Sequence, residues 1–321
     1  MSATVIVDAA GARMGGAARF KAELDRYLAR TEREDVKVIG AGRQVNAAWL
    51  VAREMANSAK FRRVAINNVS FIAAGSARWT LLRNPLDFLT DDEQSKISLS
   101  RQPHIWRRAP VVRLAARRAD VVVTPSTAMA ERVTRILPSL HSRIVVRPHP
   151  VSADSIPSLR PDRAILCPVL FSPYKGMVSR ISEWLTATDG HIDPSLRLIV
   201  TAEQAEVPES LARSPRLELV GRLDHHDLRR LWARSRAIYF PTRIESFGYP
   251  LAEARVNGQP VIALDTPLNR EVAGPMLHSF IPGDMASLRH ATEIALAADL
   301  APDPAPFDPD DYFNWLLGPP R

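Results

Sequence analysis

The chain has 321 residues, of which 46% are hydrophobic and 24% are charged. This length allows two domains of about 150 residues each, and the composition is that of a globular protein rather than a disordered or fibrous one. The single cysteine, Cys167, excludes an internal disulfide and a cysteine-based zinc cluster, and it fits a reducing cytoplasm.

The beginning of the chain, MSATVIVDAAG, has no basic segment ahead of a long apolar one, so we expect no signal peptide. No apolar run approaches the roughly 20 residues that cross a bilayer. We therefore expect a cytoplasmic protein, soluble or peripheral on the inner face of the membrane.

The net charge of +7 is unevenly distributed. Residues 1–160 carry 26 Lys+Arg against 14 Asp+Glu, whereas residues 161–321 carry 16 against 21. A basic first half favours an anionic partner such as a membrane surface, a lipid phosphate or nucleic acid. The alternative is an arginine-rich genome, because only five of the 42 basic residues are lysine.

The first half alternates between short apolar runs and helical patterns. A strand over 4–8, a turn containing Gly11, Gly15 and Gly16, and a helix over 17–30 form the opening unit of a doubly wound sheet. The glycine spacing is not that of the dinucleotide fingerprint. Further strands are predicted at 36–40, 64–67, 79–83, 121–124 and 144–147, and further helices at 45–56 and 126–137.

Residues 101–118, RQPHIWRRAPVVRLAARR, contain six arginines. Apolar residues recur there at helical spacing, although Pro110 argues against a continuous helix. The segment could be an interfacial helix on anionic lipid, part of a nucleic-acid surface, or a solvated helix packed on the sheet. No nucleic-acid motif accompanies the charge, so we expect no nucleic acid and rank membrane contact above it.

Residues 148–161 contain four prolines without apolar periodicity and are interpreted as an interdomain linker. The predicted organisation is a first domain over 1–147, this linker, a second domain over 162–300 and a tail over 301–321. We expect the tail, with Tyr312, Phe313 and Trp315, to cross back to the first domain.

The second half restarts the alternation, with strands at 164–166, 196–201, 217–220, 237–240 and 261–264 and a helix at 286–298. Lys175 follows the first of these strands directly before a glycine, and it is the only lysine after Lys96. The compact ammonium group at this position indicates a positive charge that binds a phosphate, and the alternative is that Lys175 is an ordinary surface lysine. His225 and His226 begin a helix without nearby metal-ligand spacing, so we predict no metal site.

The stretch from Pro241 to Gly274 carries the strongest signal. Glu245 lies in a loop after a buried strand, Gly248 and Pro250 start a helix, and Glu253 falls in its first turn. That is the carboxyl end of a strand, where open α/β sheets bind ligands. The start of the helix favours binding of a phosphate, and Glu253 could accept hydrogen bonds from a ribose diol. The alternatives are that Glu253 only complements the helix dipole and that Glu245 is a solvated surface residue.

ESFGYPLAE, followed by GQPVIALD and NREVAG, resembles the E-x7-E donor motif of retaining GT-B glycosyltransferases, and most closely glycosyltransferase family four (glycosyl transferases group 1). The resemblance implies an α/β GT-B fold of two doubly wound, Rossmann-like domains facing across a cleft. It also implies transfer of a sugar from a nucleotide-sugar to a glycan or lipid-linked acceptor, with retained configuration and no metal or other cofactor.

The resemblance also implies roles for particular residues. In the family, an arginine precedes the Lys-Gly pair by five or six residues, where this chain has Leu170 and Val169, and Arg243 is a candidate substitute. A histidine that ends a first-domain strand in relatives is replaced here by Asn84. The expected site comprises catalytic Glu245 and Lys175; donor-binding Glu253, Phe247, Gly248, Ser246, Arg243, Gly221 and Arg222; and an acceptor or phosphate loop with Gly15, Gly16 and Asn84.

Two other functions fit the same sequence. One is a degenerate GT-B protein that binds or scaffolds without catalysis. The other is a GT-B nucleotide-sugar epimerase, which would need no acceptor.

Overall fold

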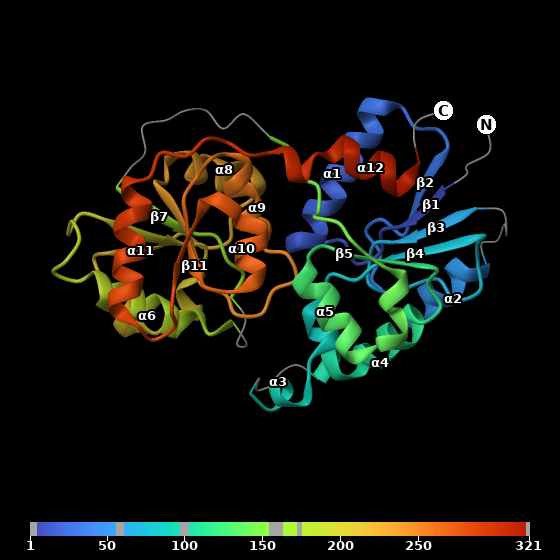
Figure 1. Ribbon diagram of the computed structural model, residues 1–321, viewed down its shortest axis with the longest axis horizontal. Helices are drawn as coiled ribbons and strands as arrows, with labels where there is room; N and C mark the ends of the chain where they lie inside the picture. Colours follow the sequence, from blue (N-terminus) through green and yellow to red (C-terminus); the bar gives the residue numbers. More distant parts are fainter. Residues whose placement is uncertain (1–4, 56–60, 97–102, 154–162, 172–174, 319–321) are drawn as a thin grey trace. The chain divides into compact units, whose positions relative to one another are not determined.

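A computed structural model describes residues 5–55, 61–96, 103–153, 163–171 and 175–318 (Figure 1). The chain forms two compact units. Unit 1 comprises Met1–Ser152, Glu245–Phe247 and Phe307–Arg321, and unit 2 comprises Ala153–Ile244 and Gly248–Pro306. Residues 148–152 of the predicted linker therefore belong to unit 1, and 154–162 lie outside the described residues.

Unit 1 contains a six-stranded sheet of order β2-β1-β3-β4-β5-β6 in which every pair is parallel. The inner strands β1 and β5 are short, mostly buried apolar runs, as is typical of parallel sheets, whereas β3 begins with two arginines. Their bounds are β1 Val5–Asp8, β2 Val36–Ile39, β3 Arg62–Ala65, β4 Ala77–Leu81, β5 Val121–Thr124 and β6 Ile144–Val146.

Helices cover both faces of this sheet. In Figure 1, α2, α4 and α5 lie on one side of the sheet, and α1 and α12 lie on the other. The helical elements are α1 Gly15–Thr31, α2 Ala47–Met55, η1 Pro85–Phe88, α3 Asp91–Lys96, α4 Pro103–Ala116, α5 Thr127–Ile136, η3 Pro138–Arg143 and α12 Pro309–Leu317.

Unit 2 contains a second parallel six-stranded sheet, of order β12-β11-β10-β7-β8-β9. Three of its strands, β7, β10 and β11, are buried along their whole length. The bounds are β7 Ala164–Cys167, β8 Arg197–Val200, β9 Leu217–Leu219, β10 Ala237–Phe240, β11 Val261–Leu264 and β12 Leu277–Phe280.

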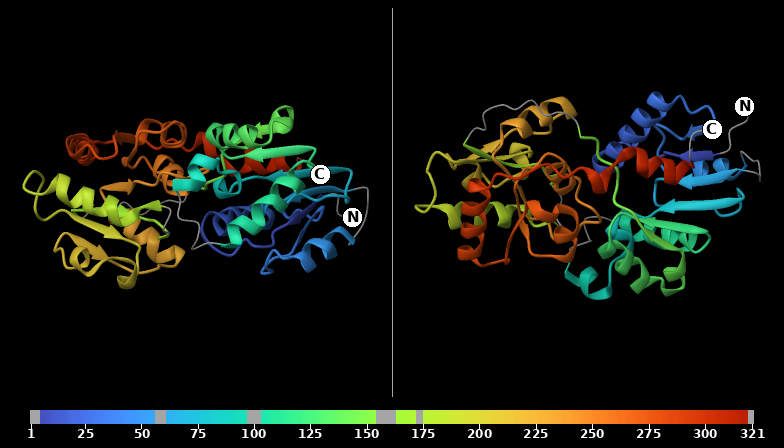
Figure 2. Two further views of the ribbon diagram at one scale, coloured as in Figure 1. Left: turned by 90° about the horizontal axis from the view of Figure 1, so that it is seen from below. Right: turned by 45° about the horizontal axis from the view of Figure 1, so that its top comes forward.

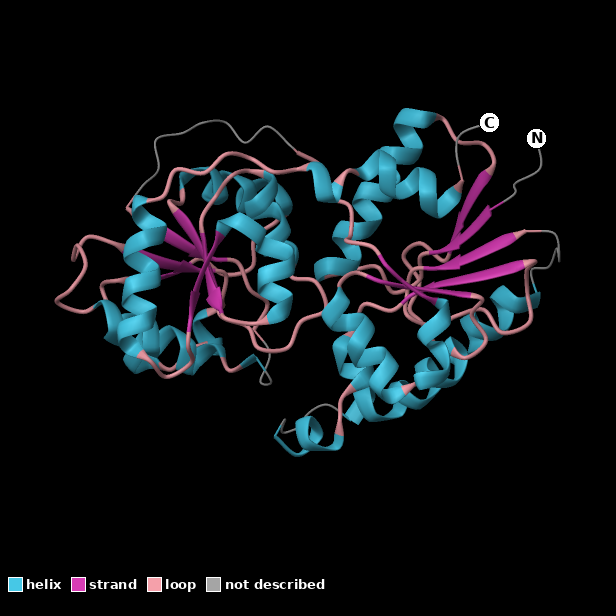
Figure 3. Ribbon diagram, viewed as in Figure 1, coloured by secondary structure: helices cyan, strands magenta, loops and turns pink. Residues whose placement is uncertain are grey.

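The helices of unit 2 also pack in two layers (Figure 3). Right-handed crossovers place α6, after β7, and α9, after β10, on opposite faces, because the chain leaves these strands in opposite directions. Helix α11 packs against α6, and α10 packs against α9. The elements are α6 Met177–Thr188, η5 Gln204–Glu206, α7 Glu209–Ala212, α8 His225–Arg234, α9 Tyr249–Val256, α10 Pro267–Ala273, η6 Gly274–Met276, α11 Met285–Ala297 and η7 Ala305–Phe307.

Helix α12 packs along α1 within unit 1 (Figures 1 and 2). Tyr27 donates a hydrogen bond of 2.6 Å to Asn314, and its ring lies 5.2 Å from that of Phe313. Arg33 donates to the carbonyl of Gly318 at 2.7 Å. Aromatic burial and these hydrogen bonds hold residues 307–318 in unit 1.

Three local expectations from the sequence are wrong. Helix α1 begins at Gly15 rather than after Gly16, so both glycines form its first turn instead of a preceding loop. Helix α4 continues through Pro110, whose missing N–H removes only one ladder hydrogen bond. Strand β4 ends at Leu81, because Asn68 in the adjacent loop accepts from the N–H groups of Arg83 and Asn84.

The helices α3, α7 and α10, the strand β12 and the short 3-10 helices had no sequence prediction. Within the ranges described, none of the helices has both the length and the apolar character needed to span a membrane.

Candidate functional site

The second sheet changes winding direction between β7 and β10. Counted from β7, its strand order is that of the dinucleotide-binding fold, 3-2-1-4-5-6. The connections after β7 and after β10 depart in opposite directions, and in doubly wound folds such a reversal opens a crevice beyond the carboxyl ends of the two strands. Ligands of doubly wound proteins bind in that crevice.

Lys175 lies beyond the carboxyl end of β7, half-buried, two residues before helix α6. Gly176 forms the N-cap of that helix with a φ of +63°, a conformation that favours glycine. Burial raises the pKa of the Cys167 thiol at the end of β7, and the positive charge of Lys175 opposes that rise. The ammonium group therefore lies near the carboxyl end of β7.

Gly248 connects β10 to α9 and has a φ of +76°. A Cβ atom there would lie 3.0 Å from Leu251 and 3.1 Å from Phe240, so even a methyl group would crowd the turn. No side chain caps the N-terminus of α9, and Pro250 contributes no N–H to it. The backbone of this turn can approach a ligand closely.

Glu253 is half-buried in the second turn of α9, since the helix starts at Tyr249. The expectation that Glu253 lies in the first turn is therefore wrong. The helix ends at Val256 with Asn257 as its C-cap, and Gly258 follows with a φ of +67°, as predicted for the end of this helix.

The three residues Glu245–Phe247 belong to unit 1, although their neighbours on both sides belong to unit 2. Ser246 is buried, donates a hydrogen bond of 2.6 Å to the carbonyl of Arg83 and accepts one of 2.7 Å from Ser126. The ring of Phe247 lies 5.1 Å from His149 and 5.9 Å from Phe307. The side chains of Ser246 and Phe247 thus pack within unit 1, and their contact with a donor stays a prediction.

Other predicted donor residues lie in unit 2. Arg243 is exposed shortly after β10. Gly221 and Arg222 follow the carboxyl end of β9, where Arg222 forms an ion pair of 3.1 Å with Glu206 and its N–H donates to Glu203. The sequence prediction for Arg222 did not include these two glutamates.

The predicted acceptor-side residues lie in unit 1. Gly15 and Gly16 are exposed at the start of α1. Asn84 caps η1, its side chain accepting from the N–H of Leu86 at 3.2 Å. It directly follows Arg83, whose carbonyl holds Ser246, so Asn84 lies near the start of the E-x7-E motif.

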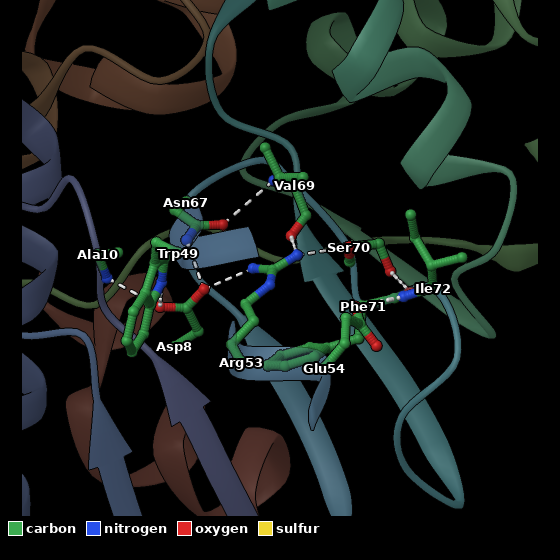
Figure 4. Close-up of polar contacts among 10 residues, drawn as sticks. All are labelled: Asp8, Ala10, Trp49, Arg53, Glu54, Asn67, Val69, Ser70, Phe71 and Ile72. Atoms are coloured by element: carbon green, nitrogen blue, oxygen red, sulfur yellow. Dashed lines mark hydrogen bonds and ion pairs between the residues drawn. The ribbon is translucent and has the colours of Figure 1, made fainter. Parts of the chain in front are cut away.

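Figure 4 shows a buried polar cluster in unit 1 that the sequence analysis missed. Asp8 is fully buried at the end of β1 and accepts four hydrogen bonds, from the N–H of Ala10 at 3.0 Å, Trp49 at 3.1 Å, Arg53 at 2.5 Å and Asn67 at 2.8 Å. The sheet of unit 1 reverses its winding between β1 and β3, so this cluster occupies its switch point.

Arg53 extends the cluster to the loop after β3. Its guanidinium also donates to the carbonyls of Val69 at 2.9 Å and Ser70 at 2.7 Å, and it stacks 4.4 Å from the ring centre of Phe71. The cluster thereby fixes the loops after β1 and β3 against α2. An aspartate ending the apolar run VIVD was the one sequence signal that could have revealed it.

The structure thus brings Lys175, Gly248 and Glu253 to one edge of the second sheet. It places Glu245, Gly15, Gly16 and Asn84 in unit 1. Among the residues described, no group of three or more His, Cys, Asp or Glu side chains is arranged to hold a metal ion. The side chains of His225 and His226 lie outside the described set.

The two parallel sheets and the similar solved structures show the GT-B fold. The chain is similar to Anabaena Alr3699/HepE in complex with UDP and glucose (TM-score 0.62, 13% identity, covering 98% of this chain and 97% of that one). It is also similar to a UDP-forming α,α-trehalose-phosphate synthase from Burkholderia xenovorans (TM-score 0.59, 11% identity, 99% and 98% covered). A third similar structure is the lipopolysaccharide outer core galactosyltransferase WaaB in its apo form (TM-score 0.57, 11% identity, 98% of both chains covered).

Residues 203–293 match the family model described as Glycosyl transferases group 1. This match and the fold together support a GT-B glycosyltransferase of group 1. No curated protein sequence matches the chain.

Proposed function

We propose that this protein transfers a sugar from a nucleotide-diphosphate sugar to an acceptor, with retention of anomeric configuration. One observation carries the proposal: the family match over 203–293 covers the turn at Gly248 and the carboxylate of Glu253, at the switch point of a sheet with nucleotide-binding order. Thr242, just after β10, adds support, because its hydroxyl is buried without a hydrogen-bond partner within the described part of the chain. A bound ligand can satisfy such a group.

In this proposal the donor diphosphate lies between Lys175 and the turn at Gly248. The bond between the anomeric carbon and the phosphate oxygen breaks as the bond to the acceptor oxygen forms on the same face of the sugar. The acceptor proton passes to the departing phosphate, so no side-chain base is needed. The Lys175 ammonium and the backbone N–H groups at the start of α9 stabilise the charge that grows on the leaving diphosphate.

The two glutamates of the motif hold other parts of the donor. Glu253 accepts hydrogen bonds from the ribose diol, and Glu245 positions the transferred sugar. Unit 1, with Gly15, Gly16 and Asn84, binds the acceptor, the role that the sequence analysis expects of a first domain over 1–147. The basic charge of this half and the galactosyltransferase among the similar structures favour a glycan or lipid-linked acceptor of the cell surface.

Of the similar structures, one is a complex with UDP and glucose and another is a UDP-forming enzyme, so UDP-sugars are the first donors to test. The test is a thermal-shift series with UDP, GDP, ADP and dTDP, each with and without magnesium. We expect one nucleotide to raise the melting temperature equally with and without the metal. A shift that requires magnesium would contradict the metal-independent part of the proposal, and no shift from any nucleotide would favour a non-catalytic binder.

Two substitutions then separate binding from chemistry. Glu253→Ala should mainly raise the donor KM, by about 10- to 100-fold, since it removes hydrogen bonds to a charged acceptor. Lys175→Ala should lower kcat by about 100- to 1,000-fold, the cost of losing one stabilising group at a developing charge. Glu293→Ala on α11 and Lys37→Ala on β2, both exposed, are the matched controls.

If Glu253→Ala and Lys175→Ala both retain the activity of their controls, the site assignment is wrong. NMR of the first product determines the stereochemistry, and an inverted anomer would refute retention. Release of free sugar isomers without any acceptor would instead indicate an epimerase.

A further inference from the structure

Helix α4 has two unlike long faces. One face is buried in the core of unit 1 through Ala109, Val112, Ala115 and Ala116. The opposite face exposes Pro110, Val111 and Leu114 to solvent, with Leu114 59% exposed. Leu114 lies three and four residues after Val111 and Pro110, so the three form one apolar stripe that is open to solvent.

Arginines flank the stripe at both ends. Arg107 precedes it, Arg117 and Arg118 follow it, and all three are exposed. None of the three has an ion-pair partner among the residues that the structure describes. The residues from 103 to 118 include no aspartate or glutamate, so the charge of this face is not offset along the helix.

The other arginines of α4 have structural partners. Arg108 pairs with the buried carboxylate of Asp87 at 2.8 Å, and Arg113 donates to the carbonyl of the same residue at 2.7 Å. These two bonds attach the helix to η1 and fix its orientation. The free arginines are therefore those beside the apolar stripe.

Helix α2 presents a similar apolar surface. Its only buried residue is Arg53, while Val51 and Met55 are 60% and 76% exposed, and Ala47, Ala48 and Ala52 share their face. Leu50 on the inner side of α2 packs against the same core cluster as Val112 of α4. Both helices lie on the same side of the sheet (Figure 1), and because Leu50 and Val112 face the core there, the exposed apolar residues of each helix lie on its solvent side.

We propose that this surface, formed by the outer faces of α4 and α2, docks on an anionic lipid bilayer. Apolar side chains enter the boundary between headgroups and acyl chains while arginines bind lipid phosphates, the pattern of interfacial helices. A second copy of the chain fits less well, because a two-fold contact through this face would bring like charges together. Nucleic acid would bind the arginines but would leave the apolar stripe in contact with polar phosphates.

Flotation of the full-length protein with phosphatidylcholine vesicles, with and without phosphatidylglycerol, tests the proposal. We expect binding to the anionic vesicles that decreases with salt. Leu114→Asp should abolish it, whereas Ile281→Asp, at an equally exposed apolar residue of unit 2 (59%), should not. Arg117→Ala with Arg118→Ala should weaken binding by about five-fold per arginine, compared with Arg197→Ala and Arg213→Ala in unit 2.

Several results would overturn the proposal. One is failure of the native protein to bind any vesicle, and another is binding that Leu114→Asp leaves unchanged. Equal binding to neutral vesicles would refute the role of the arginines. A dimer in light scattering that Leu114→Asp dissociates would assign the surface to a second copy. Melting temperatures equal to those of the controls ensure that lost flotation does not reflect unfolding, and nucleotide binding tests the donor site separately.

Discussion

Replacing Asp8 by asparagine tests the cluster at the switch point of unit 1. The carboxylate accepts two hydrogen bonds at each oxygen, from Ala10 and Trp49 at one and from Arg53 and Asn67 at the other. An asparagine keeps one acceptor oxygen and turns an NH2 group toward two donors, whichever way its amide points. Two hydrogen bonds are then lost and the Arg53 charge loses its buried counter-charge.

The expected cost is about 3–5 kcal/mol, the range for breaking a buried ion pair by removing one partner. Arg53→Met should cost a similar amount, because it strands the Asp8 carboxylate. The double variant should cost clearly less than the sum, since neither charge is left alone. Asp25→Asn, in the exposed pair with Lys21, is the control, and its cost should stay below about 0.5 kcal/mol.

Hydrogen exchange of the β1 and β3 amides is the appropriate assay, because a chain of two units need not unfold in a single transition. For Asp8→Asn, the expected loss of stability corresponds to a decrease of about 100-fold or more in the protection of these amides against exchange. Two results would refute the view that Asp8 and Arg53 neutralise each other. One is a double variant whose cost equals the sum of the costs of the two single variants. The other is a loss of stability for Asp8→Asn that is no larger than the loss for Asp25→Asn.

Two further substitutions test other parts of the structure. Burial, and then the charge of Arg83, holds the pKa of His149 well below its ordinary value of 6.5. The unfolded chain therefore binds a proton that the folded chain does not, and stability should fall by up to about 1.4 kcal/mol per pH unit as pH drops below 6.5. His149→Gln should reduce this slope in urea unfolding and the exposed control His290→Gln should not; equal slopes would contradict the assignment. Gly258→Ala should lower stability by about 1–3 kcal/mol, because the residue has a φ of +67° and its Cβ would lie 2.4 Å from the Leu300 carbonyl; an unchanged melting temperature would show that the turn relaxes.

The sequence predicted most strands because buried parallel strands are continuous apolar runs. The run Val261–Leu264 is uninterrupted and was placed with its observed bounds. Strand β12, by contrast, lies at the edge of its sheet and has the sequence LHSF, in which only Phe280 is buried. An edge strand needs no apolar run, so its pattern gave no signal.

A donor site could be proposed from the sequence because two of its candidate residues are close together in the chain. Gly248 and Glu253 lie on one turn and the helix that follows it, and spacing alone relates them. The Asp8 cluster could not be predicted, because its members come from β1, α2 and the loop after β3, and only the strand order brings them together. Helix α2 also departs from the rule that apolar residues are buried and charged residues are exposed, because Arg53 is buried and Val51 is exposed.

The division of unit 1 among separate chain segments has a consequence for how the protein is made. A ribosome adding about 5–20 residues per second needs on the order of ten seconds or more to pass from Ser152 to Phe307. During that time the face of α1 that later contacts α12 has no α12 to cover it, whereas all of unit 2 is synthesised before Phe307. The second unit can therefore complete its fold first, and the nascent first unit is the part most in need of a chaperone.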